Sequence, residues 1–173
     1  MAKNQKLKTD NKPAPLLSNP KFPHLCPMIA VAFPEPQFRI RKEQGQQQIF
    51  DALRKQWLRL SPEEWVRQNF VQYLLQVLQY PAAMVAIEKE LLLNGMKRRF
   101  DLLVFDANHQ PWMLIECKAT TINLNQPVLE QVLRYNITIP VPYLVITNGT
   151  ETRGWQKVEG RLVEIAELPV WKP

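Results

Sequence analysis

Alternating apolar and polar residues predict a β-hairpin in the middle of the chain. Residues 98–105 and 112–119 are both rich in β-branched and aromatic residues, and a polar six-residue loop, Asp106 to Pro111, separates them. Residues 84–93 predict a strand just before the hairpin, joined to it by a tight turn at Asn94-Gly95. The pattern therefore predicts a meander of three consecutive strands.

The register of the hairpin decides which polar side chains meet. If the loop closes with Phe105 opposite Trp112, counting back places Asp101 directly opposite Glu116. Facing side chains in such a pair have Cβ atoms roughly 5 Å apart. Two carboxylates at that separation repel each other unless a proton or a cation lies between them. Lys118 follows on the same face, about 7 Å further along the strand.

Helical periodicity precedes and follows these strands. The apolar spacing within 46–60 predicts a first helix, and Ser61-Pro62-Glu63-Glu64 predicts the start of a second helix, which Pro81 ends. Glu63 and Glu64 would also interact favourably with the positive end of the helix dipole. Stabilisation of the helix start could therefore account for both residues without a role in catalysis. A later helix is predicted from Pro127 to Tyr135. Apolar runs separated by turn residues predict three more strands, at 142–147, 151–158 and 161–165.

The N-terminal residues differ in composition from the rest of the chain. Residues 1–37 contain five lysines and many prolines, which predicts an extended or partly disordered arm. This arm is either a solvated leader or a contact to a phosphate backbone. Residues 38–173 are expected to form a single domain, because 173 residues with 46% hydrophobic content supply one good core.

Composition narrows the possible chemistry. The net charge of +6 permits an anionic partner, of which nucleic acid is the most common, although an ordinary basic protein has the same charge. The chain has only two histidines and two cysteines, which is too few to favour a histidine base, a zinc cluster or a disulfide framework. Cys117 is expected in the core. No apolar run nears the ~20 residues that span a bilayer, and no phosphate-binding or dinucleotide-binding glycine loop occurs. We expect a cytoplasmic protein without membrane contact.

The hairpin acids suit a divalent metal. Asp101 and Glu116 supply the hard oxygen ligands that Mg²⁺ prefers, and such an ion would polarise a phosphate and acidify its bound water. Lys118 would position or activate that water and offset charge in the transition state. The alternative is that Lys118 forms a buried ion pair with Asp101 or Glu116 that only stabilises the sheet. Burying such charges has a desolvation cost. Glu88 and Glu90 on the preceding strand are either solvent-facing edge charges or part of the same metal site.

These residues resemble a known nuclease signature. Asp101 and Glu116-Cys117-Lys118 resemble the isolated acid and the E-x-K of the PD-(D/E)XK nuclease superfamily. The N-terminal nuclease domain of type I restriction enzyme R subunits is the closer resemblance, and it covers about residues 38–150. It rests on four stretches of sequence: residues 61–68, Arg99-x-Asp101, Gln131-x-x-x-Tyr135 and the turn Thr147-Asn148-Gly149.

The resemblance implies a fold and a metal site. The fold would be α/β and restriction-endonuclease-like, with a mixed central β-sheet flanked by helices. Asp101 and Glu116 would hold Mg²⁺, for which Mn²⁺ may substitute, and Lys118 would be the catalytic lysine. A glutamate from the preceding helix usually completes the site; it falls on Glu64, with Glu63 as second choice. Phe100 stands where many members of the superfamily have proline.

The resemblance also implies partners. The helix that carries Gln131 and Tyr135, with Arg134 beside them, would act at the DNA. Family members are usually fused to an ATP-driven motor, which these 173 residues do not include. The expected function is therefore Mg²⁺-dependent hydrolysis of DNA by a stand-alone nuclease domain, with motor, methylase or specificity subunits acting in trans. The alternative is a catalytically silent DNA-binding or interaction module of a restriction or defence system.

Overall fold

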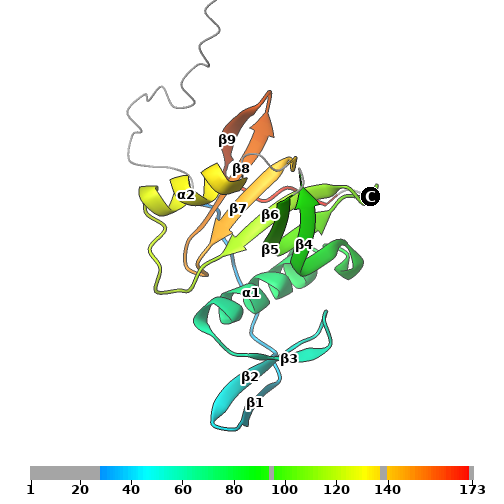
Figure 1. Ribbon diagram of the computed structural model, residues 1–173, viewed down its shortest axis with the longest axis vertical. Coiled ribbons are helices and arrows are strands. Elements are labelled where there is room, and N and C mark those ends of the chain that lie inside the picture. The colour runs from blue at the N-terminus through cyan, green and yellow to red at the C-terminus, as the bar shows by residue number, and fades with distance from the viewer. Residues whose placement is uncertain (1–27, 94–95, 137–139, 172–173) are drawn as a thin grey trace, which may run out of the picture.

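The computed structural model describes residues 28–93, 96–136 and 140–171 of the protein. Its centre is a mixed six-stranded sheet (Figure 1). The strands, in their order across the sheet, are β4 (Val85–Leu93), β5 (Met96–Phe105), β6 (Pro111–Cys117), β7 (Tyr143–Thr147), β8 (Thr152–Val158) and β9 (Arg161–Ile165). Neighbouring strands are antiparallel except for β6 and β7, which are parallel. The three strands of the predicted meander and the three later strands are confirmed, whereas the predicted turn at Asn94-Gly95 lies outside the described residues.

Two helices cover opposite faces of this sheet. Helix α1 (Pro62–Gln72) packs on the face that carries Val104, Ile115 and Cys117, and helix α2 (Gln126–Asn136) packs on the face that carries Ile146. Alternation along β6 and β7 sends neighbouring residues to these two cores. The α/β class, with a mixed sheet flanked by helices, is confirmed. No helix in the described ranges is long and apolar enough to cross a membrane.

Helix α1 begins as its sequence predicts. The Ser61 hydroxyl accepts a hydrogen bond from the Glu64 amide at 3.0 Å, and Pro62 occupies the first turn, where its missing amide costs nothing. A π-helical turn (Tyr73–Val77) and a short 3-10 helix (Ala82–Met84) then lead into β4.

The helix predicted over 46–60 is wrong. The chain instead forms a separate antiparallel sheet of β1 (Ile40–Glu43), β2 (Gln46–Asp51) and β3 (Gln56–Arg59), which lies below α1 in Figure 1. Gln44 and Gly45 reverse the chain with φ values of 49° and 80°. The Asp51 carboxylate then accepts hydrogen bonds from two amides of the next turn, those of Leu53 and Arg54, and so competes with helix formation.

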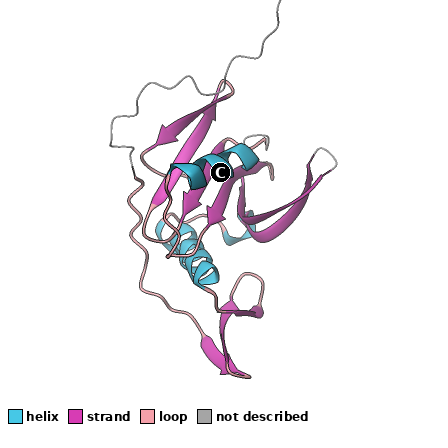
Figure 2. Cartoon of the chain, turned by 60° about the vertical axis from the view of Figure 1, so that its left-hand side comes forward, coloured by secondary structure: helices cyan, strands magenta, loops and turns pink. Residues whose placement is uncertain are grey.

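The described part of the predicted N-terminal arm, from Met28, runs as an extended loop along the body of the protein to the small sheet (Figure 2). The Ile29 amide donates to the Thr152 carbonyl of β8 at 2.9 Å, and the Ile29 side chain is buried. A Cβ at Gly154 would lie 2.8 Å from Ile29 Cδ1, so the Ile29 side chain packs directly over this glycine of β8. Phe33 packs edge-on against Phe70 of α1. Residues 1–27 lie outside the described residues.

Candidate active site

The hairpin register brings the two predicted acids together. Leu102 of β5 faces Ile115 of β6, as predicted, and Asp101 and Glu116 are the next residues of the two strands. On the other side of β5, Ile87 pairs with Leu102 and Lys89 with Phe100, so Glu88 lies across from Asp101. Three acids from three neighbouring strands therefore follow one another across the sheet: Glu88, Asp101 and Glu116.

The closing end of the hairpin differs from the prediction. Phe105 pairs with Pro111 and not with Trp112, because the register shifts after Val104. A bulge of this kind absorbs one residue and leaves the pairs before it unchanged. The wrong pair at the loop therefore does not disturb the pairing that leads to Asp101.

Asp101 uses both carboxylate oxygens. Its Oδ2 accepts a hydrogen bond from the Cys117 amide of β6 at 2.8 Å, and its Oδ1 accepts one from the Arg67 guanidinium of α1 at 2.9 Å. The Cys117 side chain is fully buried in the core beneath α1, as predicted. Asp101 thus lies where β5, β6 and the first turns of α1 meet.

Glu116 and Lys118 form a pair beside Asp101. Lys118 Nζ donates to Glu116 Oε1 at 2.8 Å, and both side chains are partly buried. Burial raises the pKa of Glu116, the negative charge of Asp101 raises it further, and Lys118 only partly opposes the shift. Burial alone would lower the pKa of Lys118, but its bond to Glu116 and the surrounding acids raise it, so the ammonium stays protonated.

The turn after β7 fixes the chain that carries Lys118. The Lys118 amide donates to the Thr147 carbonyl at 2.8 Å, and the Asn148 side-chain amide donates to the Ile122 carbonyl at 2.8 Å. Gly149 has a φ of 87°, which suits glycine, and lies against Val66 of α1. The predicted Thr147-Asn148-Gly149 turn therefore holds the end of β6 in place.

Glu64 points from α1 into a dense set of polar partners. It is 5% exposed and accepts hydrogen bonds from Arg67, from Gln68 at 2.8 Å and from Arg54 at 3.4 Å. Burial raises the pKa of Glu64, although these three partners oppose the shift. Glu63, one residue earlier, is half-exposed and lies 3.3 Å from Arg67. Both oxygens of Glu64 are therefore engaged by cations or by an amide.

Sequence reasoning missed Arg67, which joins most of these acids. Its guanidinium binds Glu63, Glu64 and Asp101, and its side chain is only 5% exposed. Burial would lower the pKa of Arg67, but the charges of Asp101 and Glu64 raise it above its ordinary value. Arg67 follows Glu64 by three residues and Glu63 by four, so helical spacing could have predicted this contact.

Arg54 is a second arginine that the sequence did not reveal. It reaches from the turn between β2 and β3 to Asp51 at 2.6 Å, and it also binds Glu64 and Glu88. Glu88 takes a positive φ of 48° within β4 and also pairs with Arg99 at 2.8 Å. We call this set the arginine cluster; its members are Asp51, Arg54, Glu63, Glu64, Arg67, Gln68, Glu88 and Asp101.

The family model for the type I restriction enzyme R protein N terminus (HSDR_N) matches residues 62–169, well over half of the chain. The chain belongs to this family. None of the curated proteins compared with the chain matches it. The family match begins with the first residue of α1 and includes Asp101, Glu116 and Lys118, whereas β1–β3 precede it.

The residues that the family resemblance assigns to DNA lie on α2, across the sheet from α1. Gln131 is exposed near the middle of this helix, which begins at Gln126 with Asn125 as its cap. Arg134 and Tyr135 belong to the same helix, but their side chains lie outside the described residues.

The donor atoms of this family member fit a lightly held magnesium ion. Within the described ranges, no group of three or more histidine, cysteine, aspartate or glutamate side chains converges as a ready ligand set. Asp101 and Glu116 nevertheless place two hard oxygen donors side by side, and Asp101 helps to raise the pKa of Glu116. Because Mg²⁺ keeps several waters and is usually bound by one or two protein carboxylates, Asp101 and Glu116 are the residues that would hold such an ion.

Proposed function

We propose that this member of the type I restriction enzyme R N-terminal family is a Mg²⁺-dependent endonuclease domain that hydrolyses phosphodiester bonds of DNA. One observation carries the proposal: Asp101 and Glu116 adjoin on neighbouring strands, with the Lys118 ammonium 2.8 Å from Glu116. The family gives the context, since restriction systems act on DNA. The proposed nuclease is of the PD-(D/E)XK type.

Each residue has a defined role in the proposal. Asp101 and Glu116 hold the metal, Mg²⁺ or Mn²⁺, which when bound supplies a Lewis acid for the phosphate and a more acidic water. Lys118 is the catalytic lysine. Its bond to Glu116 and the surrounding acids raise its pKa, so in this proposal it acts as a cation that orients the attacking water and offsets charge on the phosphoryl oxygens.

Glu64 has a supporting role in this proposal. Its oxygens are occupied by Arg67, Arg54 and Gln68, so its contacts favour holding Arg67 against Asp101. Direct ligation of the metal by Glu64, with Glu63 as the second choice, stays a prediction of the family resemblance. The DNA contacts of Gln131, Arg134 and Tyr135, and motor, methylase or specificity subunits acting in trans, are also proposed.

Nicking of supercoiled plasmid tests the proposal. We expect the wild-type protein to convert plasmid to the open-circular form in Mg²⁺ or Mn²⁺ and not in EDTA, and Asp101→Asn to lose this activity. Glu167→Gln, which removes an exposed acid, is the matched control and keeps it. Wild type that cuts no faster than Asp101→Asn in either metal would defeat the enzyme claim.

A second readout separates metal binding from cutting. If Asp101 and Glu116 hold the metal, Mg²⁺ raises the melting temperature of wild type and leaves that of Asp101→Asn unchanged. The engagement of both Asp101 oxygens by protein groups favours one other function, a DNA-binding module that does not cut. That module would bind DNA without nicking it under any metal condition.

A further inference from the structure

The three-stranded sheet β1–β3 has one outward face that is rich in arginine. Cross-strand pairing places Arg41, Gln48 and Arg59 in one row, one residue from each strand. Phe50 pairs with Trp57 two residues further along the same face. Arg39, whose carbonyl accepts a hydrogen bond from the Phe50 amide, adjoins this aromatic pair. Arg39, Arg41 and Arg59 are all exposed.

Aromatic rings hold two of these arginines in place. The Arg39 guanidinium carbon lies 3.6 Å from the centre of the Phe50 ring, and the Arg41 guanidinium carbon lies 4.3 Å from the centre of the Trp57 ring. The two rings pack edge to face at 5.3 Å. A guanidinium stacked on a ring has less side-chain freedom left to lose when it binds a ligand. Arg41 also donates to Gln48 at 2.8 Å and to Glu43 at 2.6 Å, and only its remaining N–H groups are available at the edge of the plane.

Little nearby charge neutralises this face. Arg41 forms an ion pair with Glu43 at 2.6 Å, but neither Arg39 nor Arg59 makes an ion pair with another residue in the described ranges. Residues 38–60 contain six basic and two acidic residues. One of those two acids, Asp51, is fully buried on the opposite face of the sheet. The exposed face therefore carries a local excess of positive charge.

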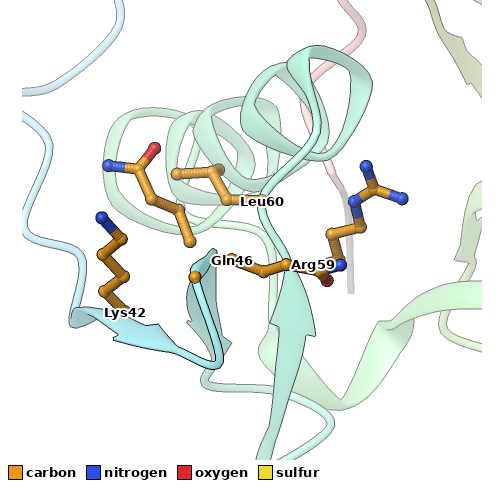
Figure 3. A pocket seen from close by; sticks show the side chains of 6 residues that line it. Lys42, Gln46, Arg59 and Leu60 are labelled. Atoms are coloured by element: carbon orange, nitrogen blue, oxygen red, sulfur yellow. The ribbon is translucent and has the colours of Figure 1, made fainter.

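A pocket lies at one end of the same sheet, beside the turn between β1 and β2. It has a volume of about 430 Å³ and is lined by Lys42, Gly45, Gln46, Gln47, Arg59 and Leu60. Figure 3 shows Lys42 of β1 and Arg59 of β3 on opposite sides of the pocket, with Gln46 between them. An ammonium, a guanidinium and side-chain amides are groups that donate hydrogen bonds to an anion.

The sheet is fastened directly to the candidate active site. Arg54, in the turn between β2 and β3, binds Glu64 of α1 and Glu88 of β4. Ile49 and Asp51 of β2 are fully buried on the inner face. The arginine-rich face is thus held on the outside of an element whose inner side meets the residues next to Asp101.

We propose that the outer face of β1–β3, which we call the arginine face, binds the phosphate backbone of duplex DNA beside the site of cleavage. Arginine forks match phosphate oxygens in a bidentate way and carry no sequence preference when they do so. The choice of DNA rests on the proposed function, but binding to this face does not require cutting. β1–β3 precede the residues that match the family, so this face is an addition to the matched region.

Binding of a fluorescein-labelled DNA duplex in EDTA tests the proposal, because no metal-dependent cutting occurs there. In the triple variant Arg39→Gln, Arg41→Gln, Arg59→Gln, we expect affinity at low salt to fall roughly ten-fold or more. The slope of log affinity against log salt should become less negative by about one for each phosphate that an arginine no longer neutralises. The fall in affinity should be the same for duplexes of different sequence.

Single variants guard against an unfolded triple variant. Arg59→Gln should weaken binding and reduce the salt slope, whereas Arg161→Gln, which removes an exposed arginine from β9, should change neither. Equal effects of these two variants, or DNA affinity unchanged in a folded triple variant, would overturn the proposal and favour an acidic protein surface as the partner. Absence of DNA binding by wild type would also overturn it.

The two proposals fail separately. A wild type that binds DNA through the arginine face but nicks no plasmid refutes the endonuclease and supports this inference. A metal-dependent nicking activity with undiminished DNA affinity in the triple variant refutes this inference and leaves the endonuclease standing.

Discussion

Glu64 and Glu116 are both partly or fully buried acids whose pKa values are raised chiefly by burial, yet their surroundings differ. Glu64 lies among Arg67, Arg54 and Gln68, which together engage both of its oxygens. Within the described residues, the Glu116 side chain has a single hydrogen-bond partner in Lys118, and the neighbouring Asp101 repels it. A raised pKa alone therefore does not identify a working acid; the balance of charge around the acid does.

This difference separates two parts of one polar region. In the arginine cluster, cations meet acids from four parts of the fold and hold α1, β4, β5 and the β2–β3 turn together. Around Glu116, Lys118 only partly opposes the rise in pKa that burial and the charge of Asp101 cause. We infer that the other members of the cluster stabilise the fold, that Asp101 belongs to both parts, and that a metal and a phosphate would bind on the side of Asp101 that faces Glu116.

The largest effect expected is the loss of the framework in Arg67→Ala. Removing the guanidinium leaves Glu64 and Asp101 without their shared cation, and breaking a buried pair in this way costs about 3–5 kcal/mol. Urea unfolding measures this loss in the free energy of unfolding. Arg99→Ala, which removes a 65% exposed partner of Glu88, should cost no more than about 1 kcal/mol. Equal losses in the two variants would show that the cluster does not stabilise the fold.

Removing the candidate catalytic cation should act on rate and leave the fold intact. Lys118→Ala is expected to slow plasmid nicking by about 10²–10³-fold, the usual effect of losing one group that stabilises transition-state charge. The matched control is Lys97→Ala, since Lys97 is 77% exposed and makes a similar pair with Glu90 at 2.9 Å. A nicking rate in Lys118→Ala equal to that of Lys97→Ala would contradict the role given to Lys118.

Neutralising each glutamate compares the two acids directly. Glu64→Gln should lose about 1–3 kcal/mol, because it weakens charged hydrogen bonds inside the cluster, and it should keep the rise in melting temperature with Mg²⁺. Glu116→Gln should change stability by less than about 1 kcal/mol and lose the response to Mg²⁺. If Glu64→Gln instead abolishes that response, Glu64 is a ligand, as the family resemblance implies.

The smallest expected effect concerns pH: the contributions of Glu88 and Glu116 to the stability of the fold should change with pH in opposite directions. Burial would raise the pKa of Glu88, but Arg54 and Arg99 lower it below the ordinary 4.5. Its contribution to stability is therefore present above pH 4.5 and is lost as pH falls through the lowered value. Glu116, with a raised pKa, penalises the folded state as pH rises from 4.5 through that raised value.

Thermal unfolding across this pH range measures both effects. The deficit of Glu88→Gln relative to wild type should shrink as pH falls below 4.5, and any advantage of Glu116→Gln should appear only above it. Parallel curves for the two variants would contradict the contrast between the arginine cluster and the Glu116 side.

Sequence patterns predicted the parts of the site that depend on local order. Strand alternation and one assumed turn were enough to bring Asp101 next to Glu116, because a two-residue period carries the register along the hairpin. The bulge after Val104 changed the loop without changing that result. Ser61 and Pro62 likewise predicted the start of α1, where cap and proline chemistry are local.

Long-range contacts could not be predicted in this way. Arg54 meets Glu88 across 34 positions of sequence, and no spacing rule relates the two residues. The wrong prediction of a helix over 46–60 has a related cause. The spacing of the apolar residues fits one helix as well as it fits two strands joined by a turn; these residues are Ile49, Phe50, Leu53, Trp57 and Leu58. The Asp51 carboxylate decides between them by capping the turn, and its burial depends on α1.

The contact between Ile29 and Gly154 has a practical consequence for anyone who expresses this protein. A fragment trimmed to the family match, from residue 62, would contain every candidate catalytic residue. It would also lack the side chain that occupies the notch at Gly154, the ring that packs on Phe70 and the arginine that reaches Glu88. The unit recognised by sequence comparison is thus smaller than the unit that folds, and clones intended for assay should begin before residue 28.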